Sequence, residues 1–244
     1  MISELLDEYE LKARVAPGLI MVLPVLLVAL YIAPILSSLP IFAASGICTV
    51  VLIYALGHLA RARGEAIEPA LWASWGGPPS TRFLRHRDVA FATELKTAIR
   101  KALEHKFSIR LLSAAEERME PGRAEGAIAD AFRQVRQYLR QRDSAGLWHK
   151  HNIEYGYSRN LLGCRWPWLV MSLASTGFAA VYGAKKGLGT VNPASFVAFL
   201  SLIFAVYLGW AVLPAATKRI ADGYAESAWI AFLRVSEEES RSGS

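Results

Sequence analysis

Long stretches without charge are the feature that most constrains how this chain can fold. No Asp, Glu, Lys, Arg or His occurs from Val15 to Gly57, from Trp166 to Ala184 or from Thr190 to Thr217. A helix needs about 20 mostly apolar residues to cross about 30 Å of hydrocarbon. The first stretch is long enough for two such helices, and each of the others for one. The sequence therefore predicts an all-α integral membrane protein with four transmembrane helices in two pairs.

The first stretch offers one turn, at Ser37-Ser38-Leu39-Pro40, where polar residues and a proline interrupt the apolar run. We place the four spans at about 17–36, 40–58, 166–184 and 192–213. The N-terminus is acidic and the apolar run that follows it is long, whereas a cleaved signal has a basic start and a short apolar core. The first span is therefore predicted to be a retained anchor.

Basic residues mark the cytoplasmic side of a membrane protein. Residues 58–164 carry 18 of the chain's 27 basic residues against 12 acidic ones, and further basic residues flank the spans on the same side. Only Lys185 and Lys186 oppose this orientation, in the short turn between the third and fourth spans. The prediction is a multi-pass protein of the bacterial inner membrane with both termini in the cytoplasm.

The predicted organisation has six parts. They are an amphipathic segment (1–14), a transmembrane hairpin (15–58), a cytoplasmic helical domain (59–164), a second transmembrane hairpin (165–213), a cytoplasmic helix (214–235) and a disordered polar tail (236–244). In the first part, Ile2, Leu5, Leu6 and Tyr9 share one helical face.

Helical periodicity divides the central domain into three predicted helices. The first runs over 89–106 with Asp88 as its N-cap, the second over 123–141, and the third from Ser144 toward Leu162. The stripe expected to face inward is Phe91, Leu95, Ala98 and Ala102 in the first helix, and Ile128, Phe132, Val135 and Leu139 in the second. A short pair of strands around 107–112 is the alternative for the intervening segment.

The loop from Trp75 to Asp88 is the most distinctive segment. Paired glycines and prolines give it a tight, irregular shape, and hydroxyl and guanidinium donors follow them. Such donors bind phosphate, either of a lipid headgroup or of a nucleotide. The candidate ligand-binding residues are Ser80, Thr81, Arg82, Arg85, His86 and Arg87. The alternative is a structured connector whose arginines meet anionic headgroups.

A second cluster runs from Trp148 to Asn160. His149 and His151 are two residues apart, so on a helix they face different sides and do not form a zinc pair. A polar network that joins the domain to the membrane is the favoured interpretation, with Glu154 pairing with an arginine of the Trp75–Asp88 loop. Its candidate members are Asp88, Asn152, Glu154, Tyr157, Arg159 and Asn160.

The spans contain no Asp, Glu, Lys or Arg, which argues against a proton relay or an ion-coupled transporter. The third span has a stripe of small residues, Ser175, Ala179 and Gly183, which predicts close helix packing either within one subunit or between subunits of a homo-oligomer. Neither Cys48 nor Cys164 belongs to a metal or redox spacing. No catalytic residue, metal or cofactor is predicted.

The net charge of +6 and the pI near 9.4 raise the question of a nucleic-acid partner. The basic residues are interleaved with acids and crowd the membrane side. The sequence therefore favours a bilayer with anionic headgroups as the partner, rather than nucleic acid.

Two motifs, W-G-G-x-P-x-T-x-x-L-R-H in the Trp75–Asp88 loop and N-x-E-Y-G-Y-x-R-N at Asn152–Asn160, lie between pairs of spans. With this layout the chain resembles uncharacterised bacterial four-span membrane proteins. In layout it also resembles the multi-span membrane effectors of nucleotide-signalled anti-phage defence systems. That resemblance implies assembly in the inner membrane and a cytoplasmic domain that senses a protein or nucleotide signal.

The leading hypothesis is an oligomeric, non-enzymatic inner-membrane protein with a sensing or docking domain, acting as a membrane-disrupting or pore-type effector in defence or stress. One rival is a membrane-bound enzyme acting on a lipid or nucleotide phosphate. It would use Arg82, Arg85, His86 and Asp88, with Glu154 or His149 as acid or base. Another rival is a scaffold subunit of a membrane complex.

Overall fold

The computed structural model describes residues 10–36 and 45–242, and every regular element in these residues is a helix. The all-α prediction is therefore confirmed for them. The chain divides into two compact units: unit 1 comprises Met1–Glu68 and Ile153–Thr217, and unit 2 comprises Pro69–Asn152 and Lys218–Ser244. The predicted amphipathic segment falls largely, and the predicted turn at 37–40 entirely, outside the described residues.

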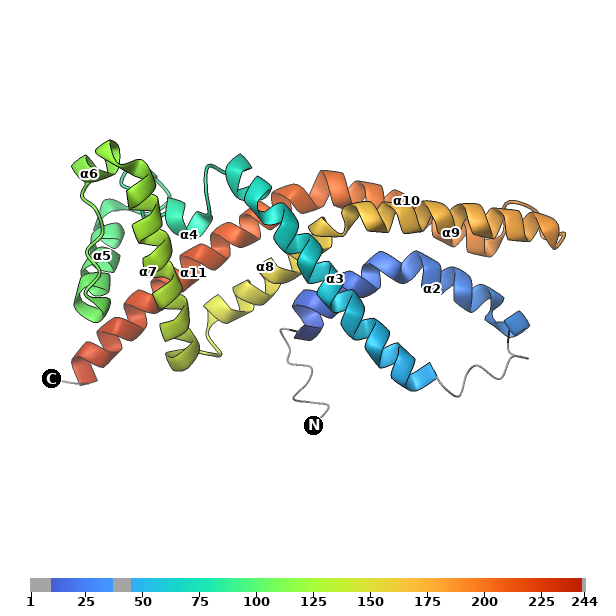
Figure 1. The fold of residues 1–244 in the computed structure, drawn as a ribbon, viewed down its shortest axis with the longest axis horizontal. Helices are drawn as coiled ribbons and strands as arrows, with labels where there is room; N and C mark the ends of the chain where they lie inside the picture. Colours follow the sequence, from blue (N-terminus) through green and yellow to red (C-terminus); the bar gives the residue numbers. More distant parts are fainter. Residues whose placement is uncertain (1–9, 37–44, 243–244) are drawn as a thin grey trace. The chain divides into compact units, whose positions relative to one another are not determined.

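Figure 1 shows the helices of both units. Unit 1 holds η1 (Glu10–Val15), α2 (Ala16–Leu36), most of α3 (Ser45–Ser74), the second half of α8 (Leu147–Gly163), α9 (Arg165–Lys185), α10 (Pro193–Val206) and η3 (Tyr207–Val212). Unit 2 holds α4 (Pro79–Arg82), α5 (Thr93–Phe107), α6 (Ala114–Met119), α7 (Pro121–Arg142), the start of α8 and most of α11 (Leu213–Ser242).

Among the described residues, two helices are long and apolar enough to cross a membrane: Glu10–Tyr31 and the continuous helix Pro193–Ser242. This finding supports membrane association. α9 has a similar length, but its tryptophan, serine, threonine and glycine residues lower its mean hydropathy. The second predicted span, 40–58, is described only in part. A total of four spans therefore remains a prediction.

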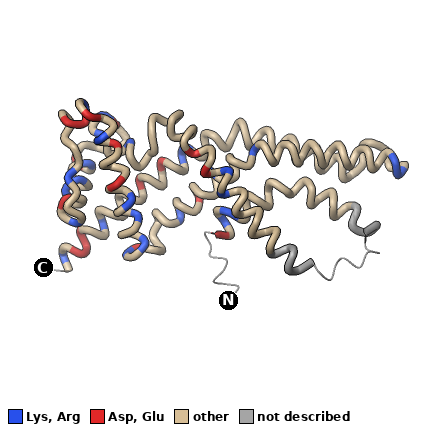
Figure 2. Tube along the Cα trace, viewed as in Figure 1, with Lys and Arg blue, Asp and Glu red and all other residues tan. Residues whose placement is uncertain are grey.

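α9 and α10 pack closely in unit 1 through small side chains. Their buried residues include Ser172, Ser175, Ala179, Gly183, Ala194, Ser195, Ala198 and Ala205, with Trp168 as a large exception. Large apolar side chains on the same helices point outward, and Val170 and Phe204 are 61% and 57% exposed. Figure 2 shows the charges of this pair gathered at the helix ends. A helix bundle in water normally has the reverse arrangement, with its large apolar side chains inside.

The turn between α9 and α10 is built around Asn192. Its Oδ1 accepts the Ser195 N–H at 3.1 Å, Ser195 Oγ accepts the Asn192 N–H at 2.9 Å, and Asn192 Nδ2 donates to the Ala179 carbonyl at 3.0 Å. A Cβ at Gly183 would lie 2.1 Å from Asn192 Nδ2, so only glycine permits this approach. These bonds satisfy the first turn of α10 and hold the two helices together.

A wide π-helical turn, η3, joins α10 to α11. Pro214 follows it within the same continuous helix. Proline has no N–H to donate to the Trp210 carbonyl, and its ring crowds that oxygen. The wider turn before Pro214 relieves this crowding. The structure thus has one helix from Pro193 to Ser242, which includes the helix predicted over 214–235.

The core of unit 2 lies between α7, α11 and α5. α7 is close to the helix predicted over 123–141 and buries all four residues expected to face inward. Aromatic rings join the helices: Phe132 lies 5.1 Å from Trp229, and Phe107 stacks on Phe232 at 5.5 Å. Trp229 and Phe232 are fully buried. Burying side chains of this size stabilises the fold by about 1.5–3 kcal/mol each.

α5 differs from the prediction in where it begins and which face it buries. It starts at Thr93 rather than at 89, and Asp88 does not cap it, because Asp88 Oδ1 accepts the Ala90 N–H at 2.8 Å inside the preceding loop. α5 itself buries Lys96, Ile99 and Leu103. Of the predicted stripe, Phe91 is buried but precedes the helix, whereas Leu95, Ala98 and Ala102 are half-buried. The Lys96 amine lies on the buried face, where it donates to carbonyl oxygens of that loop.

The segment 108–113 is an irregular link and not a pair of strands. Side chains replace a partner strand here: Arg100 donates to the Leu112 carbonyl at 2.7 Å, and His86 Nε2 lies 3.2 Å from the same oxygen. The two short helices α4 and α6 were not predicted. α6 starts at a capping box in which Ser113 and Glu116 exchange hydrogen bonds.

The tail predicted to be disordered is helical as far as Ser242. Glu239 explains the difference, because it pairs with Lys106 and lies 3.3 Å from the Arg142 guanidinium. The hydrogen bond from Lys106 lowers the pKa of Glu239 below 4.5 and raises the pKa of Lys106 above 10.5.

We expect Glu239→Gln to loosen the end of α11 in a pH-dependent way. A carboxyl with a lowered pKa contributes stability that is present above its ordinary pKa of 4.5 and is lost as pH falls through the folded value. Hydrogen exchange in residues 233–242 should therefore be a few-fold faster in the variant at pH near 7. At a pH below the folded pKa of Glu239 the two proteins should match.

Glu237→Gln is the control, because Glu237 is exposed on the same helix turn. An equal effect of both variants, or a difference that persists at acid pH, would contradict the anchoring role of Glu239.

Candidate functional site

The Trp75–Asp88 loop is fixed to the core of unit 2. Gly76 and Gly77 have φ angles of 79° and 118°, a region that favours glycine. The Trp229 indole of α11 donates its Nε1–H to the Ser80 carbonyl at 2.9 Å. Thr81 is buried, at 3% exposure. Two of the predicted ligand-binding residues, Ser80 and Thr81, thus lie where the loop is anchored.

Arg82 is occupied by groups of unit 2. Its guanidinium donates to the Trp75 carbonyl at 3.0 Å and pairs with Asp222 of α11 at 2.9 Å. Asp88, at the end of the same loop, lies 3.4 Å from Arg82 Nε. These contacts give Arg82 a structural role in closing the loop.

Arg85 is also held inside unit 2, at 6% exposure. It donates to the Gly76 carbonyl at 2.7 Å and pairs with Glu125 of α7 at 2.8 Å. Its Nε, however, is buried without an acceptor among the described residues. An orphaned buried donor is costly, and the Nε atoms of Arg82 and Arg100 share this condition in the same part of unit 2.

Two buried cations of α5 bind the same loop. Lys96 Nζ donates to the Arg85 carbonyl at 2.7 Å, and Arg100 donates to the Leu84 carbonyl at 2.8 Å. Burial lowers the pKa of both groups, and the neighbouring Glu117 partly opposes this effect. A lysine at position 96 was not expected inside, and its carbonyl partners are what make its burial tolerable.

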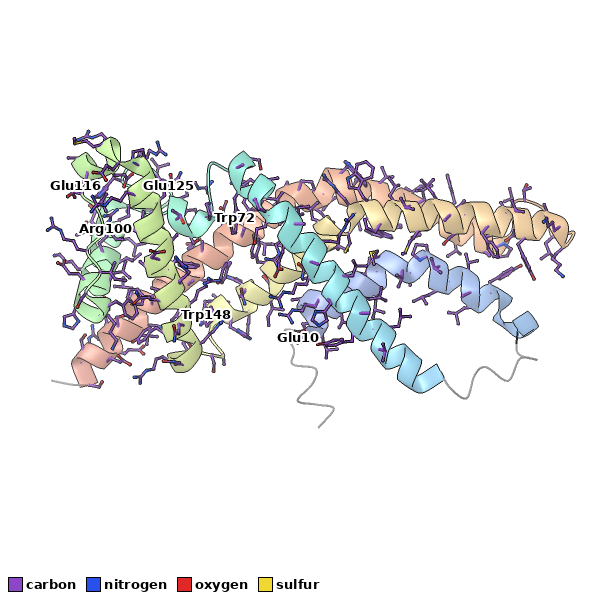
Figure 3. The ribbon with its side chains drawn as sticks, in the orientation of Figure 1. Glu10, Trp72, Arg100, Glu116, Glu125 and Trp148 are labelled. Atoms are coloured by element: carbon purple, nitrogen blue, oxygen red, sulfur yellow. The ribbon has the colours of Figure 1, made fainter. Side chains whose placement is uncertain are left out.

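A cavity of about 390 Å³ lies beside the loop, between α6 and α7. It is lined by Arg85, His86, Arg87, Ala114, Glu117, Arg118, Pro121, Ala124 and Glu125. Figure 3 labels Arg100, Glu116 and Glu125, which mark α5, α6 and α7 in this part of unit 2. The structure therefore brings three of the predicted ligand-binding residues, Arg85, His86 and Arg87, to one cavity.

The acidic residues of the cavity already have partners. Both carboxylate oxygens of Glu117 accept the His86 backbone N–H, at 3.0 and 3.1 Å, and Glu117 lies 3.8 Å from Arg100. Glu125 pairs with Arg85. The exposed cations Arg87 and Arg118 remain at the cavity, and Arg87 is 3.8 Å from Glu125, beyond hydrogen-bond distance.

Sequence reasoning missed Glu117 and Arg118 because it did not predict α6, and it missed Glu125 because nothing local indicates the pairing of that residue with Arg85. The Ser-x-x-Glu capping box at Ser113–Glu116, followed by Pro121, was the signal that could have found this short helix.

The Asn152–Asn160 segment contributes a second polar cluster, in unit 1. Arg159 pairs with Glu68 of α3 at 2.9 Å, and Tyr155 donates its hydroxyl to the same carboxylate at 2.7 Å. Asn160, at 1% exposure, donates to the Ala13 carbonyl at 2.7 Å. Arg159 and Asn160 thus make polar contacts inside unit 1, together with Glu68 and Tyr155, which the sequence did not reveal. That such contacts join a cytoplasmic domain to the membrane stays a prediction.

The other predicted members of this network lie apart from it. Glu154 is exposed and makes no ion pair with a described residue. Tyr157 is half-buried, and burial raises its pKa. Asp88 and Asn152 belong to unit 2.

The small-residue stripe of α9 packs within the chain. Ala179 clusters with Val28 of α2 and with Ala194 and Ala198 of α10, and Gly183 meets Asn192. Ser175 is buried on the same face. Of the two alternatives for the stripe, this is packing within one subunit.

The described side chains show neither an exposed cysteine nor a histidine cluster that could bind a metal. Cys164 is fully buried, and burial raises the pKa of its thiol to about 11. His151 Nδ1 lies 3.1 Å from the Gly223 carbonyl and 3.0 Å from Ser227 Oγ. In residues 10–36 and 45–242, no three His, Cys, Asp or Glu side chains gather as a metal site would need.

Comparison of the chain with protein-family models, with curated proteins and with solved structures gives no match.

Proposed function

We propose that this protein is a four-span inner-membrane protein whose helical central domain serves as a sensing or docking part in the cytoplasm. The observation that carries the proposal is the inverted packing of α9 and α10, with small residues inside and large apolar residues outside. Only 22% of the apolar 18-residue stretch within the helix Pro193–Ser242 is buried. The core helix of a soluble protein would be mostly buried, whereas a helix surrounded by lipid gains from apolar exposure.

Aromatic and basic side chains at the start of α9 support the same proposal. Trp166 lies 5.0 Å from Trp210, and the Arg165 guanidinium lies 5.3 Å over the Trp210 ring. Tryptophan and arginine favour the headgroup region of a bilayer. They would mark the cytoplasmic boundary of the third and fourth spans, with Lys185 and Lys186 at the opposite end.

Labelling of single cysteines tests this topology. In a background with Cys48→Ala and Cys164→Ala, Lys186→Cys should react with a membrane-impermeant maleimide in intact spheroplasts. Glu94→Cys and Glu238→Cys, both exposed positions of unit 2, should react only after permeabilisation. Equal reactivity of all three positions in intact cells would contradict the proposed orientation.

The sharpest form of the proposal is a homo-oligomeric effector that compromises the membrane in bacterial defence or stress. Its support is the resemblance in layout and the apolar outer faces of α9 and α10, which would be available to other copies. The small-residue stripe packs within the chain, so assembly would use those outer faces. A strictly monomeric protein in mild detergent, with no loss of membrane potential on expression, would count against this form and favour a scaffold subunit.

A membrane-bound enzyme acting on a lipid or nucleotide phosphate is the second candidate, because Arg85 and His86 line the same cavity. Neither Asp88 nor the suggested acid–base residues, Glu154 and His149, are among the lining residues. Release of phosphate from a phosphate ester by the purified protein, abolished by His86→Ala, would favour the enzyme.

A further inference from the structure

We propose that the cavity beside the Trp75–Asp88 loop binds the phosphoryl group of a phosphate monoester. This inference rests on the proposed sensing role of the central domain and names the chemical class of its ligand. The cavity, at about 390 Å³, has the volume of a small-molecule pocket and exceeds what a lone phosphate ion needs.

The donors at the cavity suit a doubly charged anion. Arg87 and Arg118 are exposed on it, and neither makes a hydrogen-bonded ion pair with a described residue. Arg85 is nine-tenths buried beside them, with its Nε–H lacking an acceptor. Guanidinium groups bind phosphate oxygens in pairs of hydrogen bonds. A phosphoryl group here would neutralise the two exposed arginines.

The acidic lining does not oppose such a ligand. Glu117 accepts the His86 N–H and faces Arg100, and Glu125 is paired with Arg85. The charge left unpaired in the cavity is therefore positive.

α7 reinforces this positive potential. The helix has 22 residues, begins at Pro121, and contributes Pro121, Ala124 and Glu125 to the lining. The N-terminus of a helix carries about half a positive charge and unpaired N–H groups, which favour phosphate.

Thermal unfolding of the full chain in mild detergent tests the inference. Inorganic phosphate and pyrophosphate, compared with chloride at matched ionic strength, should raise Tm by about 3–6 °C at a tenfold excess over Kd. Nanodiscs of phosphatidylethanolamine with and without phosphatidic acid form the second arm, because phosphatidic acid presents the same group on a lipid.

The double variant Arg87→Ala/Arg118→Ala should lose the shift, and Arg133→Ala should keep it. All three arginines are exposed, so the variants should unfold at the wild-type Tm without ligand. A rise in Tm with the soluble ions identifies a free phosphorylated molecule as the ligand. A rise in Tm only with phosphatidic acid identifies a lipid headgroup as the ligand. Either result supports the site.

No shift in either arm, or a shift that survives the double substitution, overturns the inference. The topology labelling is independent of this binding measurement. Failure of the ligand site would therefore leave the proposed membrane topology standing, and failure of the topology would not explain an absent shift.

Discussion

Replacing Gly163 with alanine should destabilise unit 1 by about 3 kcal/mol, at the upper end of what overpacking costs. A Cβ at Gly163 would lie 2.6 Å from the carbonyl carbon and oxygen of Arg63 and from the Gly64 nitrogen. All three are backbone atoms, so no side chain can move aside. Relief would require α3 and α8 to separate, which would also stretch the Arg159–Glu68 contact between the same two helices.

Gly177→Ala and Gly126→Ala are matched controls for this prediction. Both glycines lie within helices, and a Cβ at either would meet no atom within 4 Å. Alanine at such positions usually stabilises a helix, by about 0.4–1 kcal/mol. Thermal unfolding in detergent compares the three variants. If Gly163→Ala were as stable as the controls, the close crossing of α3 and α8 would be wrong.

The positions of helices were the part of this fold most open to prediction. Absence of charge located α2 and α9 to within one residue at each end, because the length that hydrocarbon demands is itself a strong constraint. Apolar periodicity located α7 for the related reason that one of its faces is buried. Both signals are local, and they need no knowledge of a partner segment.

The contacts of charged residues were not open to prediction in this way. Arg82 pairs with Asp222, which follows it by 140 residues, and nothing local indicates that pairing. Lys96 is buried because carbonyl oxygens of an irregular loop receive its amine, whereas its sequence position suggests an exposed residue. Side chains that look like ligand donors can therefore be paired inside the fold, as Arg82 is. The proposed ligand site depends on the arginines that stay exposed, Arg87 and Arg118.

The small-residue stripe of α9 shows a different limit of prediction from the sequence. Ser175, Ala179 and Gly183 predict a close helix neighbour but not which one. The neighbour proves to be α10 of the same chain, because α10 carries Ala194 and Ala198 where the stripe needs small partners. Assembly between subunits therefore has to be sought on the outer faces.

Trp229→Ala should destabilise unit 2 by about 3–5 kcal/mol, the usual cost of emptying the space of a large buried aromatic side chain. Trp229 is fully buried and packs against Phe132 and Phe232. Its indole also donates to the Ser80 carbonyl, so it couples the packing of α11 to the shape of the Trp75–Asp88 loop. Trp166→Ala, at a side chain that is 54% exposed, should cost far less.

Trp229→Phe separates packing from hydrogen bonding. Phenylalanine retains most of the buried volume but cannot donate, so the loss should be about 1–3 kcal/mol, most of it from the unpaired carbonyl. Hydrogen exchange of residues 76–88 should accelerate in this variant even where unit 2 stays folded. If Trp229→Phe left that exchange unchanged, the loop would be held by its other contacts, those of Arg82, Arg85, Lys96 and Arg100 among them. If it accelerated the exchange and also weakened phosphate binding, the indole would be a positioning group for the cavity, acting through the loop that carries Arg85 and Arg87.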